Sequence, residues 1–190
     1  MTNLRDETNA LPEIRIERRE EDQLSTSEIT QLAALLDACF PDTFNGRVYF
    51  KQLPNSRFLA WQGNEICGQI GLSHRMMRLG QRPVRVFGVI DLCVSNQQRR
   101  TGIGGKLLDT LIDTARQAGA DMVLLFADDP RLYAARGFAL RPNRCRWLAL
   151  DDHRSLGVKF EALEDCMMSL VLGDIDWPDK AELDMLGYLY

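Results

Sequence analysis

Hydrophobic residues recur along this chain at two different spacings, which predict its helices and strands. Between residues 28 and 39 they follow the helical repeat, with a capping box formed by Ser25 and Glu28 before them and Pro41 after them. A second helix is predicted for residues 102–118, where one face is apolar and the opposite face is charged. Each helix therefore has one face that must pack against the rest of the protein.

Short apolar runs, several of them alternating with polar positions, predict the strands. They cover residues 14–16, 58–61, 66–72, 84–94, 122–127, 138–150 and 167–172, with a short helix at 130–136 and an acidic tail after the last strand. Gly63 and Asn64 join two of these strands as a hairpin. The pattern predicts one α+β domain over residues 13–190, with a mostly antiparallel central sheet flanked by helices, after a flexible arm at residues 1–12.

Composition and charge narrow the class of protein. The 190 residues are 45% hydrophobic and 26% charged, the profile of a globular domain rather than a disordered chain. With 23 basic and 27 acidic residues, the net charge of −4 disfavours a protein that wraps nucleic acid. Five scattered cysteines without a Cys-x-x-Cys pair, and only two histidines, argue against a metal site. The sequence has no signal-peptide or membrane-span pattern, so we expect a cytoplasmic protein without a membrane partner.

The most informative stretch is a predicted strand end that runs into a glycine-rich helix start at residues 94–108. The first amides of a helix have no acceptor within it, and the helix dipole adds partial positive charge, so an anion binds well there. Glycines let the anion approach the backbone, and three basic residues stand in a segment without acids. The predicted pyrophosphate site comprises Arg99, Arg100, Thr101, Gly102, Ile103, Gly104, Gly105 and Lys106.

Spacing excludes two common phosphate-binding motifs in this stretch. A dinucleotide fingerprint would need glycine at the position of Leu107, and a P-loop would need serine or threonine there. What remains, Arg-x-x-Gly-x-Gly, resembles the loop with which the GNAT superfamily of N-acetyltransferases binds the pyrophosphate of coenzyme A. A second motif of that superfamily, Tyr-x-x-x-Gly-Phe, follows at Tyr133, Gly137 and Phe138 in the expected order.

The resemblance implies the GNAT acyl-CoA N-acyltransferase fold, with a mixed, mostly antiparallel central sheet flanked by helices, and acetyl-CoA as the cofactor. Within the superfamily, residues 66–108 and 132–138 look most like the aminoglycoside 2'-N-acetyltransferases and, more remotely, the nodulation N-acyltransferases. The resemblance covers the middle of the chain and is weak in the C-terminal third.

The same resemblance assigns roles to individual residues. It implies that Tyr133 is the general acid that protonates the departing thiolate. It also implies that backbone amides of the preceding strand hold the pantetheine arm and polarise the thioester carbonyl, once a bulge has freed them from the sheet. The amides in question belong to Leu92, Cys93 and Val94.

The sequence leaves the general base open. Asp91 is the only acid between Glu65 and Asp109, and it either accepts the proton of the amine or pairs with a nearby arginine. His74, on the neighbouring strand, has a suitable ordinary pKa and is also a candidate contact for the acceptor; the alternative is a partly exposed, hydrogen-bonded strand residue. Cys93 would allow a covalent acyl-enzyme, although a cysteine in an apolar strand is usually a small buried hydrophobe.

Residues 161–190 bear on the acceptor because they contain eight acidic residues and one basic residue. Carboxylates with aromatic rings can hold a cation. Asp176 and Trp177 resemble an Asp-Trp pair that lines the acceptor site of aminoglycoside 2'-acetyltransferases, and a solvated acidic tail is the alternative.

These observations predict an N-acetyltransferase that moves an acetyl group from acetyl-CoA directly to a primary amine. We expect the acceptor to be a small molecule such as an aminosugar, an aminoglycoside or a polyamine. Three alternatives stay open: a longer acyl chain, a protein amine as acceptor, and a CoA-binding domain without turnover. The oligomeric state also stays open, with a homodimer among the candidates.

Overall fold

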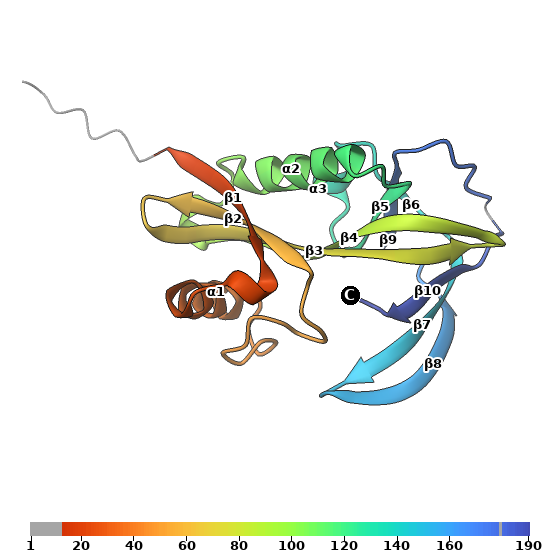
Figure 1. Cartoon of the computed structure of the whole chain (residues 1–190), viewed down its shortest axis with the longest axis horizontal. Coiled ribbons are helices and arrows are strands. Elements are labelled where there is room, and N and C mark those ends of the chain that lie inside the picture. Colours follow the sequence, from red (N-terminus) through yellow and green to blue (C-terminus); the bar gives the residue numbers. More distant parts are fainter. Residues whose placement is uncertain (1–12, 179) are drawn as a thin grey trace, which may run out of the picture.

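The computed structural model describes residues 13–178 and 180–190, so the expected arm at residues 1–12 lies outside the described residues. The elements are β1 (Ile14–Glu20), α1 (Thr26–Cys39), β2 (Ser56–Gln62), β3 (Glu65–Leu79), β4 (Arg82–Val94), α2 (Ile103–Gln117), β5 (Met122–Phe126), α3 (Arg131–Ala134), β6 (Ala139–Leu140), β7 (Arg144–Asp151), β8 (Arg154–Ala162), β9 (Met167–Val171) and β10 (Leu183–Tyr188). Short 3₁₀ turns follow β1 and β4. The predicted α+β class is confirmed (Figure 1).

One mixed sheet runs through the molecule, with the strand order β6-β9-β5-β4-β3-β10-β7-β8. The first half of β3 also pairs with β2, and β2 pairs with β1. β4 with β5 and β7 with β10 are parallel, whereas the other described pairs are antiparallel. The sheet is therefore mostly antiparallel, as the sequence predicts.

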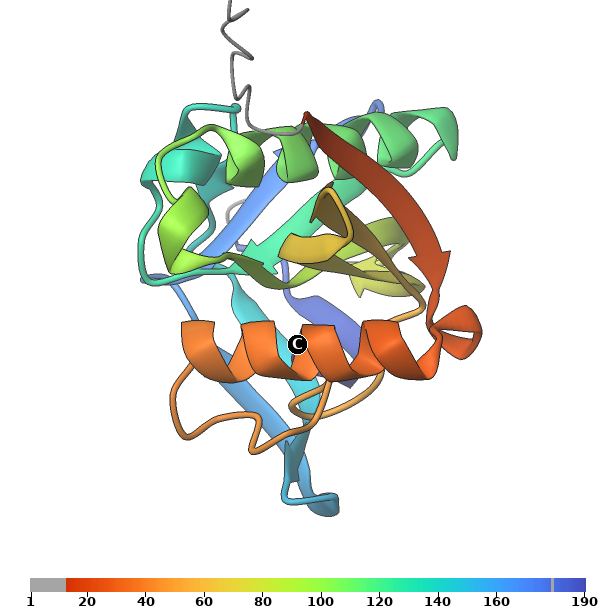
Figure 2. The same cartoon turned by 90° about the vertical axis from the view of Figure 1, so that its left-hand side faces the viewer.

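The two long helices lie on opposite sides of the sheet (Figure 2). On the α2 side, Leu107, Leu108 and Leu111 are fully buried against strand residues such as Ile70. On the α1 side, Leu32 and its helical neighbours pack in a separate cluster. Both clusters form because each helix has one apolar face, and the result is a sheet that is covered on both sides around β3 and β4.

The start of α1 shows how closely a local pattern can determine an element. The Ser25 hydroxyl accepts a hydrogen bond from the Glu28 backbone N–H at 3.2 Å. In return, the Glu28 carboxylate accepts one from the Ser25 backbone N–H at 2.8 Å. This reciprocal pair is the predicted capping box, and it satisfies amides that would otherwise lack a partner at the helix start.

Two predictions for the C-terminal third are wrong. Residues 138–150 do not form one strand, because a break at Pro142 and Asn143 separates β6 from β7. The buried Asn143 amide instead donates to the backbone carbonyls of Pro178 (2.9 Å) and Ala181 (2.8 Å). This long-range contact overrides the apolar pattern that suggested a continuous strand.

The expected acidic tail is the second correction. Residues 183–188 form β10, which lies between β3 and β7 in the sheet, and Leu183 and Met185 are fully buried. The sequence analysis also missed β8, which pairs with β7 in a hairpin that extends away from the rest of the sheet (Figure 1). The acids of this region alternate with apolar residues that face a core, a pattern that the charge count concealed.

Candidate active site

β4 carries a bulge close to its C-terminal end. In the ladder with β3, Gly71 lies opposite Ile90. Two residues earlier on β3, Gln69 lies opposite Cys93, so β4 has one extra residue between these pairs. Asp91 lies within this extra stretch and has a φ of 49°, in the left-handed region that few residues other than glycine adopt. The bulge implied by the family resemblance is therefore present.

β4 and β5 separate beyond a short parallel contact. Residues 86–88 pair with residues 122–124, and among the described residues the ladder between these strands extends no further. The end of β4 is thus open toward α2 and α3, and a cavity of about 260 Å³ lies there. It is lined by Leu92, Cys93, Val94, Gly104, Asp129, Leu132 and Tyr133. Five of these seven are residues that the sequence predicts for the site.

The start of α2 provides bare backbone amides beside this cavity. Gly102 is the N-cap with a φ of 88°, and no side chain among the described residues caps the helix. Lys106 is the first residue whose N–H bonds within the helix, to the Gly102 carbonyl at 3.0 Å. The three amides before it have no acceptor within the helix. Arg99, Arg100 and Lys106 are exposed around them, so this helix start fits a pyrophosphate in geometry and in charge.

Gly105 allows α3 to pack closely against α2. A Cβ at this position would lie 2.2 Å from Nη2 of Arg136, which leaves no room for a side chain while that arginine keeps its place. The Arg136 guanidinium pairs with Asp109 on α2 (Nε to Oδ1, 2.6 Å) and donates to the Leu132 carbonyl on α3 at 3.2 Å. Arg136 therefore fixes α3, and with it Tyr133, against the helix that holds the bare amides.

Tyr133 is half-buried at the wall of the cavity. Its ring meets Phe138 edge to face, with centroids 5.9 Å apart, and Phe138 itself is buried. Gly137, with a φ of 86°, makes the turn between them, which explains the spacing of the Tyr-x-x-x-Gly-Phe motif. Burial, and to a smaller extent the charge of Asp129, raise the pKa of the Tyr133 phenol. The phenol is therefore protonated at neutral pH, as a general acid must be.

Asp91 has the properties of a base that works near neutral pH. Burial raises the pKa of its carboxyl to about 6, while the positive charges of Arg57 and Lys51 act in the opposite direction. Lys51 is itself partly desolvated, which lowers the pKa of its ammonium group, and it donates to the Tyr190 carbonyl at 3.4 Å. A carboxylate with this pKa is ionised at neutral pH and still basic enough to accept a proton.

Four residues at or beside the site are not among those predicted from the sequence. Asp129 lines the cavity. Lys51 and Arg57 act on Asp91 through their charge, and Gln69 bonds to Arg57 and to the Asp91 carbonyl. Lys51 and Arg57 come from segments without any local motif, so only the fold brings them to Asp91. A signal did exist for Gln69, because it stands in a strand between Gly68 and Gly71. Glycines inside a strand often mark a bulge or a close approach of two backbones.

The other predicted acceptor residues lie apart from this cavity. His74 is exposed on β3 opposite Phe87, three ladder positions from Ile90, and the centroids of the His74 and Phe87 rings lie 4.4 Å apart. Burial, together with the charges of Arg85 and Arg18, lowers its pKa. Among the described residues that line the Tyr133 cavity, His74 is absent.

Asp176 and Trp177 do not lie together at the cavity either. Asp176 is exposed, whereas the Trp177 ring is buried in the core cluster beneath β7 and β10. The indole N–H donates to Oδ1 of Asn143 at 2.7 Å, and the Arg141 guanidinium lies over the ring at 4.6 Å. These contacts give Trp177 a role in packing the C-terminal strands.

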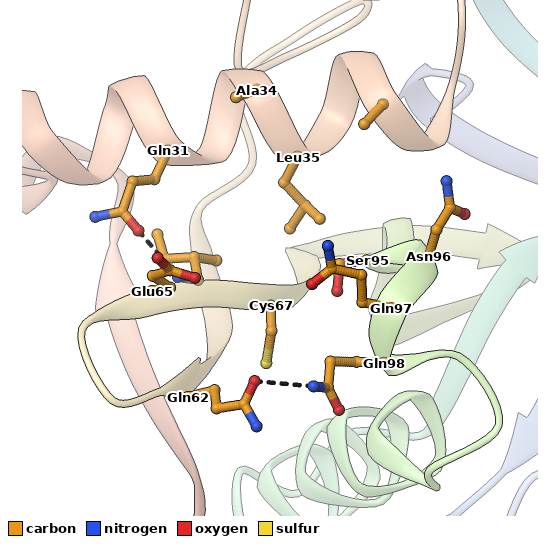
Figure 3. A pocket seen from close by; sticks show the side chains of 12 residues that line it. Gln31, Ala34, Leu35, Gln62, Glu65, Cys67, Ser95, Asn96, Gln97 and Gln98 are labelled. Carbon is orange, nitrogen blue, oxygen red and sulfur yellow. Dashed lines mark hydrogen bonds between the residues drawn. The ribbon is translucent and has the colours of Figure 1, made fainter. Parts of the chain in front are cut away.

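A larger cavity, of about 640 Å³, lies between α1, the β2–β3 turn and residues 95–98 (Figure 3). Five of its twelve described lining residues have amide side chains, and two of these bond to each other, Gln98 donating to Gln62 at 2.8 Å. Glu65 is the only carboxylate among its described lining residues. Because Tyr133 and the end of β4 line the smaller cavity, and Tyr133 is absent from the described lining of the larger one, the smaller cavity is the better candidate for the chemistry of acyl transfer. Asp91 is not among the described lining residues of either cavity; it lies in the bulge directly before Leu92.

The described part of the chain, residues 13–178 and 180–190, contains no group of three His, Cys, Asp or Glu side chains arranged to hold a metal ion. None of its helices is both long enough and apolar enough to cross a bilayer.

Comparison with known families gives a match that covers most of the chain. Residues 21–141 match the family model described as an acetyltransferase (GNAT) domain. This range contains the β4 bulge, the start of α2 and Tyr133, and it ends before β7. No curated protein gives a significant match.

Solved structures similar to this one include several N-acetyltransferases. A GNAT family N-acetyltransferase (YhbS) from Escherichia coli, solved in complex with CoA, has a TM-score of 0.61 at 18% identity, with 91% of each chain covered. A GNAT family acetyltransferase from Brucella melitensis, in complex with acetyl-CoA, has a TM-score of 0.57 at 17% identity, covering 89% of this chain and 94% of that one. The E. coli ribosomal-protein-S18-alanine N-acetyltransferase has a TM-score of 0.53 at 14% identity, with 85% and 97% covered. At these identities the likeness establishes the shared fold.

Proposed function

Because the chain belongs to the GNAT family of acetyltransferases, we propose that it transfers an acetyl group directly to a primary amine of a small molecule. Family membership makes it an acyl-CoA-dependent N-acyltransferase with acetyl-CoA as its cofactor. The proposal concerns what the family leaves open: the acceptor, the acyl chain and the residues that carry out the transfer.

One observation carries the proposal, namely that a single cavity brings Tyr133 together with the backbone that follows the β4 bulge. Gly104, which carries one of the bare amides of α2, lines the same cavity. A general acid, carbonyl-polarising amides and an anion site are therefore within reach of one bound molecule. A domain that bound CoA without turnover would need only the last of these.

We assign the proton transfers to Asp91 and Tyr133. When bound, acetyl-CoA supplies an acetyl group activated as a thioester. Asp91 accepts a proton from the acceptor amine, since an ordinary amine with a pKa near 10 is mostly protonated at neutral pH. Tyr133 donates its phenolic proton to the departing sulfur. The amides of Leu92 and Val94 are the donors for the acyl carbonyl and the pantetheine arm. Cys93, which lines the cavity between them, lies opposite Gln69 in the ladder, so its own N–H points toward β3.

The pyrophosphate would be held by the start of α2. Donors are the backbone N–H groups of Ile103, Gly104 and Gly105, and the exposed cations Arg99, Arg100 and Lys106 lie around them. The Ile103 side chain is buried in the core, so its contribution is its backbone amide alone. Thr101 donates its hydroxyl to the Gln98 carbonyl at 2.7 Å, which supports the loop before the helix.

Direct transfer is favoured over a covalent route through Cys93. The side chain of Cys93 is buried in the α1 cluster, on the side of the sheet away from α2. Its hydrogen bond with Cys39 and its burial raise the pKa of the Cys93 thiol well above the ordinary value. A thiol that stays protonated is a weak nucleophile.

The finer identity of the acceptor rests on the sequence. The resemblance to aminoglycoside 2'-N-acetyltransferases, and more remotely to the nodulation N-acyltransferases, favours an aminosugar, an aminoglycoside or a polyamine. His74, Asp176 and Trp177 remain acceptor residues in this proposal only if the acceptor extends well beyond the Tyr133 cavity. All five cysteines are free thiols, which agrees with a cytoplasmic location. Strand β8 is exposed and lies at the edge of the sheet, where a second copy of the chain could pair with it as a homodimer.

The test is release of free CoA thiol from acetyl-CoA across a panel of small amines, with Tyr133→Phe as the control. We expect at least one aminosugar, aminoglycoside or polyamine to be acetylated, and the control to be slow. Longer acyl-CoA donors and a peptide amine belong in the same panel, because preferential use of either would replace the proposed acceptor or donor. CoA binding without turnover on any amine would make the protein a binding domain.

A further inference from the structure

The polar network behind the β4 bulge takes no direct part in the proton transfers or the cofactor contacts described above, although the charge of Arg57 partly offsets the burial that raises the pKa of Asp91. It consists of Arg57 on β2, Gln69 on β3 and the backbone of Asp91, with Glu21 at its outer end. The side chains of Arg57 and Gln69 are fully buried, which is rare for an arginine and costs free energy unless every polar group is paired. Because burying these groups is costly, we expect the network to serve a function in the site.

The network fixes the direction of the Gln69 amide. Nη1 of Arg57 donates to Oε1 of Gln69 at 3.1 Å. Since a guanidinium can only donate, the oxygen of the amide must face Arg57 and its NH₂ group must face the other way. That NH₂ group donates to the backbone carbonyl of Asp91, at the bulge. Glu21 in turn holds Arg57, with Nε to Oε2 at 2.7 Å.

The hydrogen bond from Gln69 to the Asp91 carbonyl determines the direction of the Leu92 N–H. A trans peptide is planar, so the carbonyl of Asp91 and the N–H of Leu92 point in opposite directions. Gln69 neighbours Ile70, which faces the α2 core, so the alternation of β3 turns Gln69 to the opposite face. The Leu92 N–H is thereby directed to the α2 side, where the cavity with Tyr133 and Gly104 lies.

Gly68 and Gly71, on either side of Gln69 in β3, bring the backbone of β3 close to that of β4. A Cβ at Gly71 would lie 3.1 Å from Cβ of Ile90, and a Cβ at Gly68 would lie 3.2 Å from the Cys93 carbonyl oxygen. β3 thus lies tight against β4 on both sides of the bulge. Between these contacts, the Gln69 side chain bonds to the carbonyl that the extra residue displaces from the ladder.

We propose that Gln69 is a positioning residue that aims the Leu92 N–H at the thioester carbonyl of bound acetyl-CoA, and that Arg57 sets the direction of its amide. The inference rests on the proposed function, because the N–H has this purpose only if the acyl group lies in the cavity. It differs from the proposed function in concerning two side chains that touch neither acceptor nor cofactor.

The test is Gln69→Glu, which keeps the size of the side chain and the pairing with Arg57 but removes the donor to the Asp91 carbonyl. We expect kcat to fall by about 10², as for the loss of one oxyanion donor, while the Kd for CoA changes by less than about threefold. Arg57→Lys, which still donates to Oε1, should retain more activity than Arg57→Met. Gln117→Glu, an exposed change on α2, is the matched control for the added charge.

A second readout separates positioning from a merely structural role. Infrared difference spectra of acetyl-CoA labelled with ¹³C at the acetyl carbonyl report how strongly that carbonyl is polarised. We expect a shift to lower wavenumber on binding to the wild type and to Gln117→Glu, and a smaller shift with Gln69→Glu. If Gln69→Glu does not fold, Gln69→Met removes the same donor without a charge and has the same expected result.

A folded variant without the donor that keeps the wild-type carbonyl frequency and kcat would overturn the inference. This readout needs no acceptor, so failure of the proposed function has a different signature. In that case the wild type would acetylate no amine in the panel, yet its carbonyl shift and the loss of that shift in Gln69→Glu would still be measured.

Discussion

The cofactor half of the site, residues 91–138, and the C-terminal strands, residues 144–188, are built in different ways. In the first region the backbone does most of the chemistry, through a bulge in β4, an uncapped start of α2 and a turn at Gly137. In the second region side chains hold distant segments together, as the bond from Trp177 to Asn143 illustrates.

This difference has a consequence for specificity. Backbone amides recognise a pyrophosphate and a carbonyl, which every acyl-CoA carries, so the first region can serve any acceptor. The surfaces around β7, β8 and β10 are free to vary without disturbing that machinery. We therefore expect substitutions in the first region to affect cofactor binding or turnover, and substitutions in the second to affect stability first.

The largest effect should come from Gly104→Asp at the start of α2. The nearest side-chain atoms to a Cβ there are 3.6 Å and 4.0 Å away, so the protein has room to fold with the new residue. The carboxylate would face the bound pyrophosphate, and like charges in contact cost several kcal/mol, so the Kd for CoA should rise by at least about 10². Calorimetric titration measures this change.

The matched control is Gly104→Asn, which has the same size without the charge and should weaken CoA binding much less. Retained affinity in Gly104→Asp would mean that the pyrophosphate does not lie at this helix start.

The next effect is that of Tyr133→Phe, which removes only the phenolic oxygen. We expect kcat to fall by about 10² with little change in the Kd for CoA, because a general acid acts in the transition state. Steady-state kinetics and titration together provide both numbers. An unchanged kcat would show that water protonates the leaving sulfur.

A smaller and pH-dependent effect is expected for Asp91→Asn. Since the carboxyl has a pKa of about 6 and must be ionised to act as a base, wild-type kcat/KM should fall about tenfold per unit below pH 6 and level off above it. The ratio of wild type to variant, measured from pH 5 to pH 8.5, cancels the titration of the acceptor amine itself.

At pH 8 we expect Asp91→Asn to be about tenfold slower than the wild type, because part of the acceptor is already deprotonated there. A ratio that does not change with pH would leave Asp91 as an ion-pair partner of Arg57 and Lys51.

The smallest effect on catalysis belongs to the C-terminal region. Trp177→Leu loses a buried ring and its indole hydrogen bond, which should lower the free energy of unfolding by about 3 kcal/mol, as urea denaturation would measure. We expect kcat and the KM for the amine to stay within about twofold. A raised KM for the amine at unchanged stability would instead place Trp177 in the acceptor site.

The sequence alone predicts residues 91–138 better than it predicts residues 144–188. The capping box at Ser25, the glycines of α2 and the Tyr133 motif are local, and each was found because a few neighbouring residues determine the backbone. Gln69 carried a weaker signal in its flanking glycines. Arg57 and Lys51 carried none, because their role depends on which strands and loops the fold brings beside Asp91.

In the C-terminal third, the split of β6 from β7 depends on Asn143 reaching the backbone 35 and 38 residues away. The insertion of β10 between β3 and β7 is equally non-local, and no pattern within residues 183–188 specifies its neighbours. The acidic residues of this segment suggested a solvated tail, whereas Leu183 and Met185 are buried and the segment forms a strand of the sheet.

The most direct test of the whole account is a titration of CoA into ¹⁵N-labelled protein, followed by amide chemical shifts. We expect the largest shifts at the backbone amides of residues 92–94 and 103–105, and little change in those of residues 144–188. Shifts concentrated in residues 144–188, with the start of α2 unaffected, would contradict this expectation.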